Sequence, residues 1–209
     1  MEHYQKLLEN NAEWAREMVA QDPDFFRKRE QAQTPHHLII GCSDSRVPLE
    51  LMTGALPGEM FVHRNIGNQV WETDMNVLSV VQFAVDVLSV EHIIVCGHSN
   101  CGALKAADAE SAHGVIDHWL SDIRDTIRTC KPILDACPDQ DARLHQLSHL
   151  NVAQQVGVLS RMPIVQDSWR RAARPMLHGW VYDIGSGLIE RVVERVDSAE
   201  KALALIPKH

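Results

Sequence analysis

Two short apolar segments have the same form, and this shared form constrains the fold more than any other feature of the sequence. His37 to Gly41 and His92 to Gly97 each contain β-branched residues and end in glycine, and each is followed at once by a residue of a metal-binding type. Short, continuous apolar runs of this kind are typical of buried parallel strands. Glu59 to Arg64 is expected to form another strand.

Helical patterns alternate with these strands along the chain. Thr73 is expected to cap a helix that runs to about Leu88, and further helices are expected over residues 115–129 and 141–159. Pro132 and Pro138 are expected to bracket a loop between the last two. Alternating strands and helices predict an α/β fold with a mainly parallel β-sheet flanked by helices.

The C-terminal part of the sequence contains a hairpin signal. Gly185, Ser186 and Gly187 separate two strand-like segments, residues 178–184 and 188–193. Such a turn joins antiparallel strands, so one antiparallel edge strand is expected. We expect a single domain over residues 1–209, with a helical N-terminal arm of about residues 1–30.

Composition and charge narrow the class of protein. The 209 residues are 45% apolar and carry a formal net charge of −8, which argues against a surface that binds nucleic-acid phosphates. Residues 1–19 contain no apolar signal-peptide core, and the longest apolar stretch, Val77 to Val90, is too short to span a bilayer. The sequence predicts a cytoplasmic protein without nucleic-acid or membrane partners.

Four side chains near the two similar strands form a candidate metal site. Cys42 and Asp44 follow the first strand, and His98 and Cys101 follow the later one. Ligands collect beyond the carboxyl ends of strands in open α/β sheets, so neighbouring strands would bring these residues together. Two thiolates, an imidazole and a carboxylate form a complete tetrahedral set for Zn²⁺. The zinc would be catalytic if the carboxylate exchanges with water, and structural if all four ligands are permanent.

The spacing Cys42-x-Asp44-x-Arg46 followed by His98-x-x-Cys101 resembles the signature of the β-class carbonic anhydrases. The surrounding sequence is similar to bacterial members, in particular the type II subgroup, from about Phe25 to Leu188. The segments that carry this similarity are Pro57-Gly58-Glu59, His63-Arg64-Asn65, Leu78 to Leu88, His92 to Gly102 and His178 to Asp183.

This resemblance implies an activity, a cofactor and an assembly. The activity would be reversible hydration of carbon dioxide to bicarbonate and a proton by zinc-bound hydroxide. Cys42, His98 and Cys101 would be the permanent zinc ligands, and Asp44 would be a fourth ligand only when the site is closed. The family's fold has four parallel strands plus one antiparallel edge strand. Its members are homodimers, often paired into homotetramers, and the N-terminal arm would pack on a neighbouring subunit.

The resemblance also assigns residues to the substrate pocket. Gln33 matches a family glutamine that hydrogen-bonds the substrate, typically across a dimer interface. Phe61 and Ile66 match the apolar wall of the pocket, with ordinary core packing as the alternative. Gly102 either lets the backbone approach the site or only begins a helix.

Asp44 and Arg46 are expected to act as an orienting and gating dyad. Two thiolates donate strongly to zinc, so a bound water would be less acidic than at a three-histidine site, where its pKa is about 7. Asp44 would accept the hydrogen bond of the hydroxide and fix its orientation. Arg46 would hold Asp44 off the metal through a bidentate pair. Activity is expected to rise with pH.

One position departs from the bacterial pattern. Many bacterial relatives have an inhibitory bicarbonate site built from Trp, Arg and Tyr. Arg64 and Tyr182 match two of these residues, but Ile39 stands at the Trp position. Without the indole, the pocket loses an N–H donor and an aromatic wall, so inhibition by bicarbonate is expected to be weak or absent.

Two other functions fit the same ligand residues. Relatives of this fold hydrolyse CS₂ or COS, and the zinc ligands do not distinguish those substrates from CO₂. A non-catalytic, zinc-stabilised module is the other alternative, and in it Arg46 would have no role in function.

Overall fold

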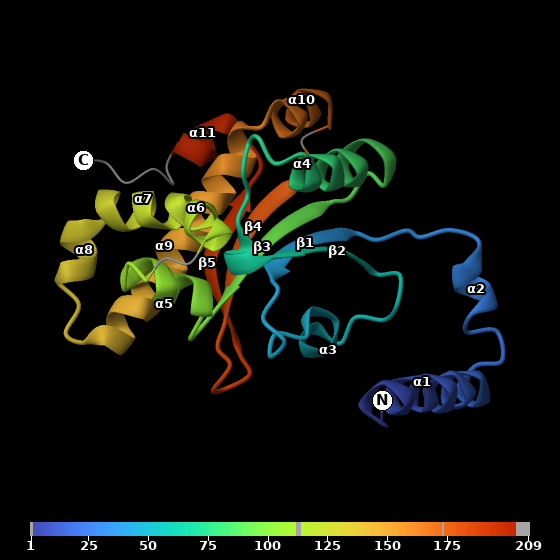
Figure 1. The fold of residues 1–209 in the computed structure, drawn as a ribbon. Coiled ribbons are helices and arrows are strands. Elements are labelled where there is room, and N and C mark those ends of the chain that lie inside the picture. The colour runs from blue at the N-terminus through green and yellow to red at the C-terminus, as the bar shows by residue number, and fades with distance from the viewer. Residues whose placement is uncertain (1, 112–113, 173, 204–209) are drawn as a thin grey trace. The chain divides into compact units, whose positions relative to one another are not determined.

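The computed structural model describes residues 2–111, 114–172 and 174–203 and divides into two compact units, residues 1–34 and residues 35–209. The first unit is helical, with α1 (Glu2–Gln21) and α2 (Arg27–Glu30). Its boundary falls close to the end of the expected N-terminal arm. The second unit holds the sheet and the remaining helices (Figure 1).

Five strands form one sheet in the second unit. They are β1 (His37–Cys42), β2 (Met60–Asn65), β3 (His92–His98), β4 (Met176–Tyr182) and β5 (Ile189–Val196). The strand order is β2-β1-β3-β4-β5, in which the first four strands are parallel and β5 is antiparallel to β4. This confirms the predicted α/β fold, including its four parallel strands and its antiparallel edge strand.

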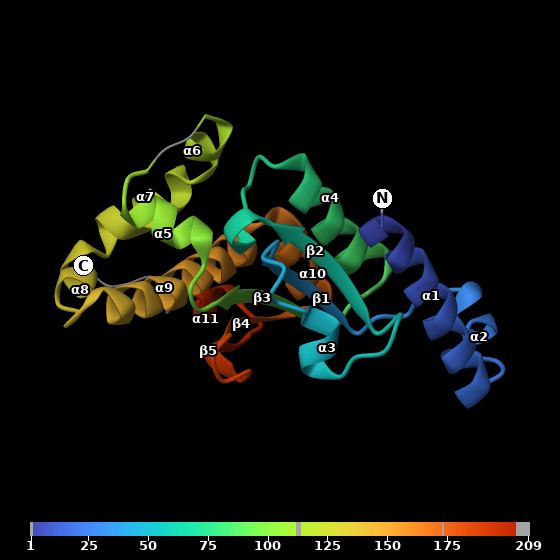
Figure 2. The same cartoon turned by 60° about the horizontal axis from the view of Figure 1, so that its bottom comes forward.

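Helices and short helical turns connect the strands and cover the sheet (Figure 2). They are α3 (Leu49–Thr53), the 3₁₀ turn η1 (Ile66–Asn68), α4 (Met75–Gln82), the π-helical turn η2 (Phe83–Val87), α5 (Gly102–Asp108), α6 (Val115–Trp119), α7 (Ser121–Thr129), α8 (Lys131–Asp135), α9 (Gln140–Arg161), α10 (Pro163–Ala172) and α11 (Ala199–Leu203).

Three local predictions were wrong. The cap of α4 is Asp74, whose carboxylate accepts a hydrogen bond from the backbone N–H of Asn76, and not Thr73. The helix expected over residues 115–129 is interrupted at Leu120, which is buried between α6 and α7. The segment that the prolines were expected to bracket as a loop contains α8. Pro132 lies in the first turn of α8, where a helix does not need its N–H.

Helix α9 lies directly on β3 and β4 because two glycines leave room for it. A Cβ atom at Gly97 would lie 2.7 Å from Cγ2 of Val152, and one at Gly179 would lie 2.6 Å from Cγ1 of the same valine. Val152 belongs to the main apolar core, which also contains Leu38 and Val95. The close approach of α9 therefore packs the core against the strand that ends at His98.

In the part of the chain that the structure describes, no helix combines the length and the apolar character needed to cross a membrane.

Candidate metal centre

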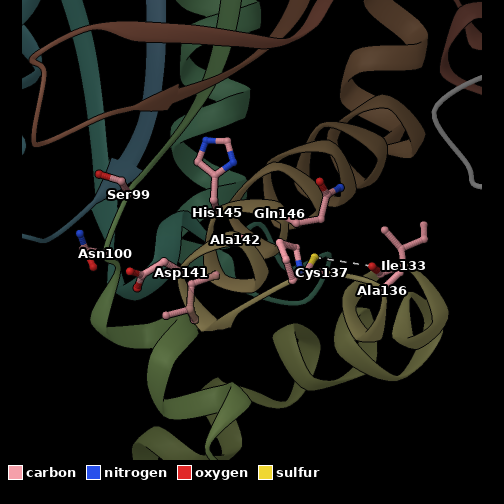
Figure 3. A pocket seen from close by; sticks show the side chains of 11 residues that line it. Ser99, Asn100, Ile133, Ala136, Cys137, Asp141, Ala142, His145 and Gln146 are labelled. Carbon is pink, nitrogen blue, oxygen red and sulfur yellow. Dashed lines mark hydrogen bonds between the residues drawn. The ribbon is translucent and has the colours of Figure 1, made fainter.

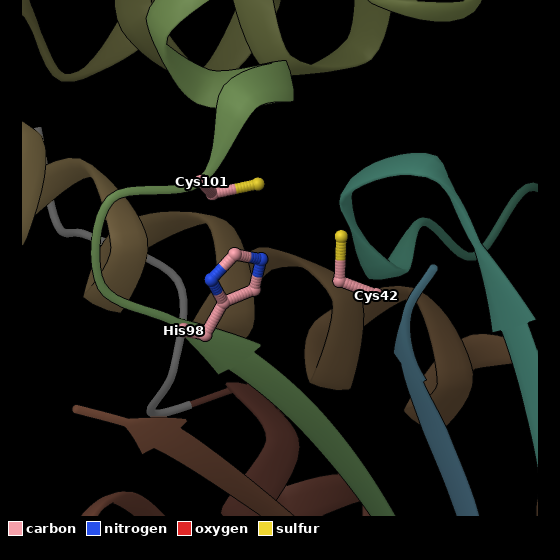
Figure 4. A group of neighbouring side chains, drawn as sticks. All are labelled: Cys42, His98 and Cys101. Atoms are coloured by element: carbon pink, nitrogen blue, oxygen red, sulfur yellow. The ribbon is translucent and has the colours of Figure 1, made fainter. Parts of the chain in front are cut away.

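The candidate metal residues meet where two neighbouring parallel strands end. Cys42 is the last residue of β1 and His98 is the last residue of β3, and these strands pair in register from His37 with His92 to Gly41 with Cys96. Cys101 directly precedes α5 as its N-cap. Figure 4 shows the three side chains converging from these three elements. The strand order thus brings together residues that lie 56 and 59 positions apart in the chain.

Three ligand atoms form a compact, buried group. The two Sγ atoms of Cys42 and Cys101 and a ring nitrogen of His98 all lie within 4.8 Å of one another. These residues are at most 4% exposed. Asp44 stands beside the group, because its Oδ2 lies 3.8 Å from Nε2 of His98. The arrangement gives three close ligands and one adjacent carboxylate.

The orientation of His98 leaves one ring nitrogen without a partner. Nδ1 lies 2.8 Å from the carbonyl oxygen of Ser99, which can only accept, so Nδ1 carries the proton. Nε2 therefore has a free lone pair. It is buried and has no hydrogen-bond partner among the described residues. A buried, unpaired polar atom is costly, and a metal ion at this position would remove that cost.

The two thiols are electrostatically suited to a cation. The Cys101 thiol and the backbone N–H of Gly67 stabilise the Cys42 thiolate and lower the pKa of Cys42, although burial acts in the opposite direction. The neighbouring Cys42 sulfur and burial raise the pKa of Cys101, although backbone N–H groups at the start of α5 act in the opposite direction. A divalent cation between the sulfurs would stabilise both thiolates. Two thiolates and an imidazole are preferred ligands of Zn²⁺, so the residues fit this ion.

Asp44 and Arg46 form a bidentate pair beside the metal residues. Nε of Arg46 lies 3.0 Å from Oδ1 of Asp44, and Nη2 lies 2.7 Å from Oδ2. The backbone N–H of Arg46 donates a third hydrogen bond to Oδ1. These donors hold the pKa of Asp44 well below its usual range, despite partial desolvation. The carboxylate is therefore charged and fixed in position.

Arg64 supports the loop that carries Asp44. Its guanidinium donates hydrogen bonds to the carbonyl oxygens of Cys42, Asp44 and Val47, at 2.6 to 3.1 Å. Ile39 is fully buried in an apolar cluster against which Tyr182 packs. Arg64 is thus engaged by the loop after β1, and Ile39 is part of an apolar cluster of the core.

The structure places the expected substrate residues in different surroundings. Gln33 is an exposed residue of the N-terminal unit. Phe61 packs on the main core and against Phe83, with ring centroids 5.7 Å apart. Ile66 is 42% exposed. Gly102 begins α5, and a Cβ atom there would meet no other atom within 4 Å.

A buried polar network behind the site was missed by sequence reasoning. Nε2 of Gln69 donates to Oδ1 of Asn151 on α9 at 2.9 Å and to the carbonyl of Gly67 at 2.6 Å. Oε1 of Gln155 accepts from the backbone N–H of Val70 at 2.8 Å. These bonds fix the turn whose Gly67 N–H supports Cys42. The bonds of Gln69 with Asn151 and of Val70 with Gln155 join residues more than 80 positions apart, so no local pattern indicates them.

The sequence matches a known protein family and curated relatives. The family described as carbonic anhydrase matches residues 37–189. A carbonic anhydrase of Emericella nidulans is 41% identical over 187 residues, which cover 90% of this chain and 82% of the relative. A carbonic anhydrase of Pseudomonas aeruginosa is 36% identical over 191 residues, which cover 88% of this chain and 84% of that protein.

Solved structures show the same relationship. A β-carbonic anhydrase of Coccomyxa, solved in complex with acetazolamide, superposes with a TM-score of 0.92 at 38% identity, covering 97% of this chain and 92% of that one. One of two tetrameric β-carbonic anhydrases from Sordaria macrospora gives a TM-score of 0.90 at 36% identity, covering 94% of this chain and 100% of that one. With a matching sequence family, a matching fold and a buried Cys-His-Cys group, this chain belongs to the β class of the carbonic anhydrases.

Proposed function

We propose that the protein catalyses the reversible hydration of carbon dioxide to bicarbonate and a proton, with Zn²⁺ held by Cys42, His98 and Cys101. The observation that carries this proposal is the buried, unpartnered Nε2 of His98 between two thiols, in a chain of the β class. A zinc ion there would supply Lewis-acid activation of water near neutral pH. Cys42, His98 and Cys101 would hold the ion. Because all three residues are buried, they would also exclude bulk water from it.

Asp44 would orient the attacking water. Its carboxylate lies next to Nε2 of His98 and can accept a hydrogen bond from water at the metal position. Because Arg46 keeps the pKa of Asp44 low, Asp44 accepts this hydrogen bond without taking the proton. The proton released by the reaction must therefore pass to another acceptor or to solvent.

Arg46 would control the position of Asp44 and so act as a gate. The bidentate pair keeps the carboxylate turned toward the guanidinium. If this pair broke, the negative charge of Asp44 would be attracted to the metal and would compete with water. The intact pair corresponds to the open arrangement that catalysis needs.

The substrate can be tested by a direct comparison of CO₂ with COS and CS₂. The zinc-loaded protein is expected to hydrate CO₂ in a stopped-flow pH-indicator assay and to release little H₂S from COS or CS₂. All three substrates are small and apolar, so the zinc ligands alone do not separate them. Faster H₂S release than CO₂ hydration would favour the hydrolase alternative. No turnover of any of the three would favour a zinc-stabilised module.

We also propose that the protein assembles as a homo-oligomer, a homodimer or a homotetramer, in which the N-terminal arm packs on a neighbouring subunit. The Sordaria macrospora relatives are tetrameric. In the single chain, α1 exposes apolar side chains, with Tyr4 68%, Leu7 65% and Leu8 50% exposed. Exposed apolar groups of this kind are typical of protein interfaces.

Light scattering coupled to size exclusion would test this assembly. The wild-type protein is expected to have the mass of a dimer or tetramer, and Leu7→Glu with Leu8→Glu is expected to reduce it. Asn10→Glu adds a charge at an exposed polar position of the same helix and serves as the control. A monomeric wild-type protein would contradict the proposal.

A further inference from the structure

A second cluster of metal-binding side chains lies apart from the Cys-His-Cys group. His145 and His149 are separated by one helical turn on α9, so both project from the same face of the helix. Glu190 lies on β5, next to its start, and faces them. The helix and the edge strand therefore present two imidazoles and one carboxylate to one another.

The three side chains point their ligand atoms at a common position. Nε2 of His145 lies 3.3 Å from the Glu190 carboxylate, and Nε2 of His149 lies 3.0 Å from Oε2 of the same group. The two imidazole centroids are 4.5 Å apart, and all three ligand atoms lie within 4.8 Å of one another. Zinc bonds of about 2.0–2.1 Å in tetrahedral geometry place neighbouring ligand atoms roughly 3.3 Å apart. The two observed nitrogen–oxygen distances are close to that spacing.

The Glu190 carboxylate lies against both imidazoles. Its oxygens lie within 3.3 Å of both Nε2 atoms, and a carboxylate attracts a divalent cation.

The exposure of the side chains indicates an open site. His145 is 46%, His149 is 27% and Glu190 is 41% exposed, so water can reach the common position. Two histidines and one glutamate leave a fourth tetrahedral position for that water. Imidazole with carboxylate suits zinc and related divalent transition metals, whereas Mg²⁺ and Ca²⁺ prefer oxygen ligands.

We propose that His145, His149 and Glu190 form a second site for a divalent transition-metal ion, of which zinc is the representative. The site is independent of the proposed catalytic reaction. A bound ion would join α9 to β5 and so stabilise the edge of the sheet against local opening.

The cluster also borders the loop of the first metal centre. His145 lines a cavity of about 750 Å³ together with Ser99 and Asn100, which lie between His98 and Cys101 (Figure 3). Ser99 is hydrogen-bonded to the β4–β5 connection, because its Oγ accepts from the backbone N–H of Ile184. An ion at the second site would therefore lie beside the loop of Ser99 and Asn100, which connects two ligand residues of the first metal centre.

Calorimetric titration with Zn²⁺ alone would test the second site. Protein whose Cys-His-Cys group is already loaded is expected to bind one further equivalent per chain, and the thermal unfolding temperature is expected to rise with added zinc. His149→Ala and Glu190→Gln should each weaken this binding by more than about tenfold. The retained first equivalent shows that each variant is folded.

Matched substitutions serve as controls. His118→Ala removes an exposed histidine of α6, and Glu194→Gln changes an exposed glutamate of the same strand as Glu190. Both controls should bind the second equivalent like the wild type. The proposal is wrong if the loaded wild-type protein binds no further zinc, or if His149→Ala and Glu190→Gln bind it unchanged.

Discussion

Replacing Cys101 with alanine is expected to remove the zinc of the first metal centre and to abolish CO₂ hydration. The substitution deletes one of three ligands. Only the His98 nitrogen and the Cys42 thiolate would then remain to hold the ion. Loss of an outer partner of a metal site costs about 10- to 100-fold in affinity, so loss of a ligand should cost more. Metal analysis by mass spectrometry and the stopped-flow assay would measure both effects.

Cys96→Ala is the matched control for this experiment. Cys96 is fully buried and lies two residues before His98 on β3, but burial raises the pKa of its thiol to about 12, so it stays protonated. This variant should keep its zinc and its activity, with only a modest loss of stability. Both cysteine substitutions are best measured in a His149→Ala background, so that the second site does not contribute zinc. Retention of zinc by Cys101→Ala would contradict the assigned ligand set.

Arg46→Ala is expected to lower kcat for CO₂ hydration by about 10²-fold without loss of zinc, since misplacing a positioning group by about 1 Å can cost about 10²-fold in rate. Without the guanidinium, the Asp44 carboxylate loses donors at 2.7 and 3.0 Å and is free to approach the metal residues. Asp44 would still be charged near neutral pH, because a carboxyl group without this partner ionises well below pH 7. The loss would therefore come from the position of Asp44 and not from its protonation.

Two variants separate position from charge. Arg46→Lys keeps the positive charge but cannot form the bidentate pair, so its activity should lie between those of the wild type and the alanine variant. Arg128→Ala removes the arginine of another Arg–Asp pair, with Asp125 on the exposed surface of α7, and should have no effect. Full activity in Arg46→Ala, with normal zinc content, would show that the pair does not gate or orient the reaction.

The local pattern of the sequence was sufficient to predict the class of fold. The apolar runs before Cys42 and His98 indicated buried parallel strands because a short strand that is covered on both faces is apolar throughout. The turn at residues 185–187 indicated the antiparallel edge strand. The helix boundaries were less predictable. The expected helix is interrupted at Leu120, which is buried, and Pro132 lies in the first turn of α8, and the local pattern specifies neither feature.

The candidate zinc residues could be chosen from the sequence because their chemistry is a property of the side chains and their spacing. Their meeting point could not, since it depends on β1 and β3 being neighbours in the sheet. The same holds for the tautomer of His98, which depends on the Ser99 carbonyl, and for Arg64, which binds three carbonyls of the β1 loop.

The cluster of His145, His149 and Glu190 shows most clearly what could not be predicted from the sequence. The spacing of His145 and His149 places two imidazoles on one helical face, but nothing in the local pattern connects them with Glu190, 41 residues after His149. Only the packing of α9 against the sheet brings that carboxylate within 3.0 Å of His149. The sequence by itself determined the class of fold and the chemistry available to the chain. The tertiary structure decided which of those groups meet, because contacts between distant residues depend on how buried surfaces pack.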